Sequence, residues 1–127
     1  MIRIGKVING LLGANEIIKE AVGIKIYPIL AAEETQPPFI VYKRTAMKPS
    51  YSKDGLYGDD GTVQIDVISQ DYAEGVDIMQ AVRQSLEWQR GVFYDVNVDM
   101  MLVDSANEYG DGKEFIQELV LKIIINH

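Results

Sequence analysis

The sequence predicts an α+β fold, in which two helices pack on one face of a mostly antiparallel sheet of about five strands. The central observation is the segment 61–86, where a two-residue apolar period changes to a helical one. Helical apolar spacing at the start of the chain and two alternating segments near its end complete the pattern. The predicted order is helix, three strands, helix and two strands. All of these elements belong to a single domain, residues 1–127.

The segment 61–86 contains a strand followed directly by a helix. Val63, Ile65 and Val67 alternate with polar residues, as expected of a half-buried strand. Asp71 is a favourable N-cap, and we expect Gly91 to close the helix at its other end. The predicted apolar stripe of this helix consists of Tyr72, Val76, Met79, Val82 and Leu86.

The N-terminal third contains the other predicted helix and two strands. Residues 2–12 place their aliphatic side chains on one helical face. Residues 24–30 and 39–47 are predicted strands, and Pro28 indicates that the first lies at, or ends at, a sheet edge. The segment 48–60 is rich in glycine, serine and charge, and we expect it to be a long loop or the solvated tip of a hairpin.

The C-terminal part contains the last two predicted strands. Residues 92–103 and 115–125 alternate between apolar and polar positions, and a Gly-Asp-Gly turn within residues 107–113 joins them. The last strand is apolar on both faces. Because such a strand aggregates when its edge is exposed, we expect it inside the sheet or covered by another subunit.

Composition excludes several classes of function. The chain has a net charge of −7, no cysteine, and one histidine at its last position, His127. The chain therefore lacks the cysteines needed for disulfides or thiolate chemistry, and it lacks an internal histidine for a Ser-His-Asp triad. Scattered basic residues in an acidic chain argue against a phosphate-binding patch. Neither a secretory signal nor a membrane span is recognisable, so we expect a cytoplasmic location.

One group of acidic residues lies in the segment 48–60. Asp54, Asp59 and Asp60 carry the oxygen ligands that calcium and magnesium prefer. Their spacing does not match an EF-hand loop, and we favour a solvated turn. The same segment carries Tyr51 and Tyr57, and tyrosine is common at protein interfaces.

A second polar group follows one predicted strand. Asp95, Asn97 and Asp99 alternate with apolar residues. Two carboxylates four positions apart on a strand are separated by ~13 Å, which is too far for a paired-carboxylate mechanism. We therefore favour a solvent-facing side of the sheet over a metal or catalytic site. Candidate neighbours on other strands are Gln64, Asp66 and Glu118.

Three motifs in order resemble a known family. They are Ile26-Tyr27-Pro28, then Pro38-Phe39-Ile40-Val41-Tyr42, then Val63-Gln64-Ile65-Asp66-Val67 followed by Tyr72 and an amphipathic helix. In this order the chain resembles the tail-completion proteins of long-tailed bacteriophages and prophages, a group that includes tail terminator and tail-to-head joining proteins. The likeness covers roughly residues 3–125, and the long acidic hairpin near the end departs from it.

The resemblance implies a structural protein with no catalytic residues, cofactor or metal. Family members form a ring, typically a hexamer, that caps the tail tube and meets the head connector. Implied partners are copies of the chain, the tube protein and the connector protein. DNA passes through the ring without specific binding, no membrane is involved, and the protein assembles in the cytoplasm before residing in the virion tail.

The residues themselves add two hypotheses about interfaces. Asp66, Asp95 and Asp99 are predicted to line or approach the ring lumen, where like charge keeps DNA from sticking. Tyr51 and Tyr57 are predicted to contact neighbouring subunits or the tube. Two alternatives stay open: a metal-binding or enzymatic α+β module that uses the acidic segment 54–60, and a bacterial adaptor protein unrelated to phages.

Overall fold

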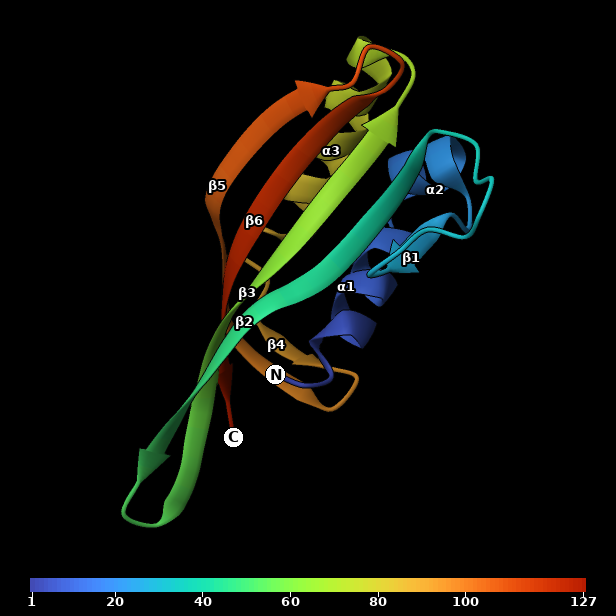
Figure 1. Ribbon diagram of the computed structural model, residues 1–127. Coiled ribbons are helices and arrows are strands. Elements are labelled where there is room, and N and C mark those ends of the chain that lie inside the picture. Colours follow the sequence, from blue (N-terminus) through green and yellow to red (C-terminus); the bar gives the residue numbers. More distant parts are fainter.

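The computed structural model describes residues 1–127 and has three helices on one face of a six-stranded sheet (Figure 1). The helices are α1 (Ile4–Gly13), α2 (Glu16–Val22) and α3 (Tyr72–Leu86). The strands are β1 (Ile26–Pro28), β2 (Phe39–Ser52), β3 (Gly55–Ser69), β4 (Gly91–Phe93), β5 (Val96–Gly110) and β6 (Phe115–Asn126). None of the helices is long and apolar enough to cross a membrane.

The α+β class is confirmed, but the predicted counts of two helices and about five strands were each one short. The elements missing from that count are the three-residue β4 and the seven-residue α2, for which the sequence indicated only a short extra turn at residues 15–20. The side chain of Asn15 caps α2 by accepting a hydrogen bond from the backbone N–H of Ile18 at 3.1 Å. Elements this short carry too few apolar repeats for a periodic signal.

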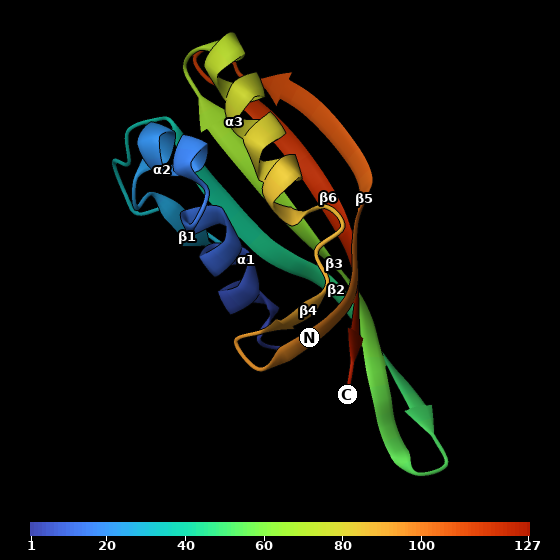
Figure 2. The same cartoon turned by 180° about the vertical axis from the view of Figure 1, so that it is seen from behind.

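The sheet has the strand order β1-β2-β3-β6-β5-β4. Only β1 runs parallel to its neighbour, and all other pairs are antiparallel. The view from behind shows all three helices on one side, so the opposite face of the sheet is not covered by any element (Figure 2). As predicted, β1 is an edge strand that ends at Pro28, and β6 lies inside the sheet.

The core lies between the helices and the covered face of the sheet. Alternate residues of β3 and β6 point into it, including Ile65, Leu121 and Ile123. The predicted stripe of α3 is partly wrong, because Ile78 and Ala81 are buried whereas Tyr72 and Val76 are exposed. The predicted cap is correct: Asp71 accepts hydrogen bonds from two backbone N–H groups. Gly91 does not end α3 but begins β4.

The segment 48–60, expected to be a long loop or the tip of a hairpin, is a β-hairpin with regular strand pairing almost to its tip. Strands β2 and β3 pair as far as Ser52 and Gly55, so only a two-residue turn separates them. Strand β6 accompanies β3 only to Gly58, beyond which β2 and β3 continue alone. Figure 1 shows this two-stranded end, residues 49–58, extending away from the rest of the molecule; we call it the arm.

The predicted strand at residues 92–103 is two strands joined by a tight turn. Tyr94 and Asp95 have positive φ angles of 51° and 64°, which turn the chain between β4 and β5. Strand β5 then runs to Gly110, seven positions beyond the predicted end at Val103. Tyr rarely adopts this left-handed conformation, whereas Asp tolerates it more readily, so local propensity indicated the turn only weakly.

Candidate assembly interface

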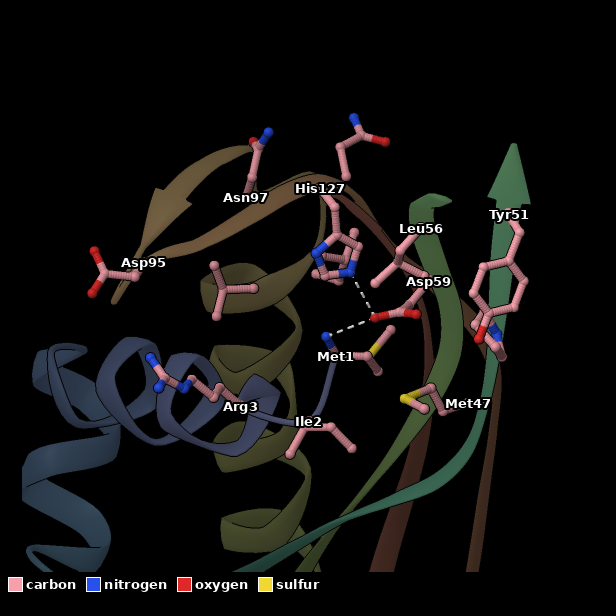
Figure 3. A pocket seen from close by; sticks show the side chains of 14 residues that line it. Met1, Ile2, Arg3, Met47, Tyr51, Leu56, Asp59, Asp95, Asn97 and His127 are labelled. Atoms are coloured by element: carbon pink, nitrogen blue, oxygen red, sulfur yellow. Dashed lines mark hydrogen bonds and ion pairs between the residues drawn. The ribbon is translucent and has the colours of Figure 1, made fainter. Parts of the chain in front are cut away.

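A buried ion pair fixes the base of the arm (Figure 3). The carboxylate of Asp59, on β3, accepts a hydrogen bond from the amino group of Met1 at 3.0 Å. Nε2 of His127 lies 3.0 Å from the same oxygen. Asp59 is only 6% exposed, although sequence reasoning placed it in a solvated turn. The two ends of the described chain and the base of the arm are thus joined through one side chain.

The charge state of Asp59 is set by two opposing effects. Burial raises the pKa of this carboxyl group, because the charged form loses hydration. Hydrogen bonds and positive charge from His127 and the Met1 amino group outweigh burial and lower the pKa below its ordinary value of 3.8. Asp59 is therefore ionised at neutral pH and holds its partners as a carboxylate.

A hollow of about 600 Å³ opens beside this junction. Its walls come from the start of the chain, the arm, the β4–β5 turn and the end of β6. Ile2, Tyr51 and Leu56 line it with side chains that are at least 48% exposed. Figure 3 shows Tyr51 and Asp95 on opposite sides of this hollow. An exposed apolar lining of this kind is typical of a surface that contacts another protein.

The uncovered face of the sheet carries a polar cluster at its centre. Nε2 of Gln64 donates hydrogen bonds to Oδ1 of Asp66 at 3.1 Å and to Oε2 of Glu118 at 3.4 Å. Burial raises the pKa of Asp66 above its ordinary value of 3.8; the hydrogen bond from Gln64 opposes this shift, and the charge of Glu118 adds to it. The cluster places two carboxyl groups on a face that no helix covers. Lys43, the register partner of Gln64, lies on the same face, and its charge lowers the pKa of Asp66.

The other two predicted lumen residues lie elsewhere. Asp95 occupies the β4–β5 turn and lines the hollow. Asp99 lies at a register shift in β5, where one of its oxygens is 3.5 Å from Nη2 of Arg90. Asp66, Asp95 and Asp99 are therefore not one cluster, contrary to what strict alternation along residues 92–103 predicted. The turn and the register shift break that alternation.

The two predicted interface tyrosines lie on the arm. Tyr51 on β2 is 73% exposed, and Tyr57 on β3 is 65% exposed. Such exposure leaves both rings free for a partner, and their role in a contact stays a prediction. The structure adds Leu56 to the exposed apolar residues of the arm. Exposure of Leu56 was not predictable, because it depends on β6 ending before it reaches this position.

The acidic residues of the segment 54–60 lie in different surroundings. Asp54 lies in the two-residue turn of the hairpin, Asp59 is held by its buried partners, and Asp60 is exposed. No group of three or more His, Cys, Asp and Glu side chains is placed to hold a metal ion. The alternative of a metal-binding module at residues 54–60 therefore gains nothing from the geometry.

A family comparison identifies the class of protein. The model of the family described as "Tail completion protein gp17" matches residues 6–114. The chain belongs to the tail completion protein gp17 family. Membership confirms the resemblance seen in the sequence, and it makes the chain a structural component of a phage-type tail. It also removes the alternative of an adaptor protein unrelated to phages.

A solved structure shares the fold of this tail completion protein. A chain from the "Virion of native gene transfer agent (GTA) particle" superposes with a TM-score of 0.81, at 15% sequence identity. The match covers 94% of this chain and 92% of that one. No curated protein matches the sequence. The helix-covered sheet therefore recurs in a virion component with little sequence in common.

Proposed function

We propose that this tail completion protein forms a ring, such as a hexamer, that terminates the tail tube and joins it to the head connector. Family membership carries this proposal. The arm supports it, because exposed aromatic and aliphatic side chains on a projecting hairpin suit contact with a second protein. Residues 1–127 would act as one domain, assembled in the cytoplasm and retained in the virion tail.

The uncovered sheet face supports a particular orientation in the ring. It carries the cluster around Asp66 and Glu118, and the chain as a whole has a net charge of −7. Carboxyl groups directed toward DNA would repel its phosphates and let the genome slide past without binding. We propose that this face, through Asp66 and not through the separately placed Asp95 and Asp99, is directed toward the lumen.

Two structural contacts are proposed outside the lumen. Tyr51 and Tyr57 on the arm would meet the tail tube, and Asp95 beside the hollow would lie near the same contact. Asp99 is already paired with Arg90, so it would contribute to an interface only at the rim. Rim charges influence association rate more than affinity.

The proposed role is tested with tail tubes polymerised from the partner tube protein. We expect purified chain to bind at one tube end, to stop elongation there and to be required for joining to heads, as seen by negative-stain electron microscopy. Tubes that elongate equally with and without the chain, and that carry no density at their ends, would refute the role.

A further inference from the structure

We propose that neighbouring copies of this chain join edge to edge, with β2 of one copy pairing antiparallel to β5 of the next. This inference rests on the proposed ring and names the surfaces that close it. It follows from three observations: both strands have long unpaired edges, the two edges carry opposite charge, and the strands run in opposite directions.

Each of these strands is covered along only part of its outer edge. Strand β1 pairs with β2 only opposite residues 40–42. Strand β4 pairs with β5 only opposite residues 96–98, and the backbone N–H of Trp88 donates to the carbonyl of Met101 at 2.7 Å. The backbone N–H of Val103 also donates to Oε2 of Glu87 at 3.3 Å. The outer edges are therefore free of a partner strand from residue 43 onward on β2 and from residue 104 onward on β5. An unpaired edge is a template for another strand.

The two free edges carry opposite charge. The basic edge, residues 43–53 along β2 and its turn, has four cations and no acidic residue: Lys43, Arg44, Lys48 and Lys53. The acidic edge, residues 104–114 along β5 and its turn, has one lysine and four acidic residues: Asp104, Glu108, Asp111 and Glu114. In a chain with only 12 basic residues, a third of them thus lie on one free edge.

No residue of the basic edge takes part in an ion pair within the chain. The ion pairs between side chains use Lys19, Arg83, Arg90 and His127, none of which belongs to the basic edge. Lys43 acts on Asp66 only through its charge, which lowers the pKa of that carboxyl group. Residues 43–48 and 104–113 are all exposed. A partner that brings carboxylates to β2 would therefore find cations that are free to pair, and a second copy of this chain carries such a segment on β5.

Strand direction favours the same pairing. Three successive antiparallel steps, β2 to β3 to β6 to β5, make β2 and β5 run in opposite directions. A copy related by rotation about an axis inclined to the strands therefore presents β2 antiparallel to the neighbour's β5. The inclination is needed because, within one sheet, residues 43–48 of β2 lie level with residues 100–105 of β5, whereas Glu108 lies level with the part of β2 that β1 covers. Because the two edges are different surfaces, the contact is head-to-tail and repeats from copy to copy, which is how cyclic rings close.

Cysteine cross-linking tests this contact without background, since the chain has no cysteine. Four double variants combine Lys43→Cys or Lys48→Cys with Asp104→Cys or Asn107→Cys, which samples neighbouring registers. Within one chain β3 and β6 separate these positions by about three strand spacings, or ~14 Å, beyond the ~7 Å that a disulfide spans between Cα atoms. Any disulfide must therefore join two copies.

We expect at least one double variant, oxidised on tail tubes, to give a ladder of covalent oligomers on non-reducing gels. The control Gln80→Cys with Asp104→Cys should give none, because Gln80 is exposed on α3, which packs over β3 and β6 in the middle of the sheet. Rings at tube ends without any edge disulfide would overturn edge pairing while leaving the ring intact. Absence of both rings and disulfides would overturn the inference together with the proposed function, and disulfides between chain and tube protein would assign the edge to the tube.

Charge reversal gives an independent readout. We expect Lys43→Glu with Lys48→Glu to raise the concentration needed for assembly about tenfold, and Asp104→Lys in the same chain to restore part of it. Lys6→Glu with Lys19→Glu changes net charge equally and should assemble like the wild type. Equal effects of the edge and control variants would refute a specific edge contact.

Discussion

Replacement of Asp59 by asparagine tests the junction at the base of the arm. The change removes a charge that is 6% exposed and leaves the amino group of Met1 buried without its counter-ion. Breaking one side of a buried ion pair costs about 3–5 kcal/mol, and we take the lower end because asparagine still accepts a hydrogen bond. For a chain of this length, about 3 kcal/mol lowers the melting temperature by roughly 10 °C.

The pH dependence of stability should change with the same substitution. Since the pKa of Asp59 is lowered in the folded state, its contribution is complete above the unfolded pKa of about 3.9 and is lost as pH falls through the folded pKa. The wild type should therefore lose stability as the pH falls below about 4. Asp59→Asn should be less stable at neutral pH and should lose less on acidification.

Urea unfolding at several pH values, followed by circular dichroism, measures both effects. Asp60→Asn is the matched control, because Asp60 is the next residue on β3 but is exposed. An exposed substitution of this kind should change stability by no more than about 0.5 kcal/mol. If Asp59→Asn and Asp60→Asn unfold at the same urea concentration, the junction contributes nothing and the reasoning fails.

Three further changes test the scaffold. Asp71→Ala removes the side chain that caps α3 and should cost about 1 kcal/mol in thermal unfolding; an unchanged melting temperature would contradict the cap. Gly58→Ala places a Cβ against the backbone carbonyl of Ile125 and should cost about 1–3 kcal/mol, whereas Gly13→Ala meets open space and should be neutral or stabilising. Asp66→Asn should be at least as stable as the wild type at neutral pH, because a raised pKa means that ionised Asp66 disfavours the fold; a clear loss in urea unfolding would contradict this sign.

Much of the fold was predictable because its signals are local. The change from strand to helix period at residues 61–86 placed β3 and α3 next to each other, and Asp71 marked the start of the helix. The helix face was less certain, since apolar residues occur on more than one side of it. Tyr72 turns out to lie over β5 and β6, where its hydroxyl donates to Glu108 at 2.9 Å and its ring meets Phe115 edge-on.

The interface residues were harder to predict because their environment depends on distant parts of the chain. Asp59 looks like a turn residue in its local sequence, yet it is buried by Met1 and His127, which are 58 and 68 positions away. The arm has the composition of a loop, and it becomes a hairpin because β2 and β3 extend their pairing past the sheet. The family motifs could be recognised without knowledge of the Asp59 contacts or of the arm, because they lie in the strands and the helix outside the arm.

The arm gives the molecule parts of different stiffness. Beyond Gly58 it is a two-stranded ribbon attached at one end, and such a ribbon has little stability of its own. The body, in contrast, is held by a packed core. A compliant tip on a rigid body tolerates a partner of imperfectly matched shape, because the tip bends while the body keeps its place. The ion pair of Asp59 fixes the base of the arm and so sets the point beyond which the hairpin can bend.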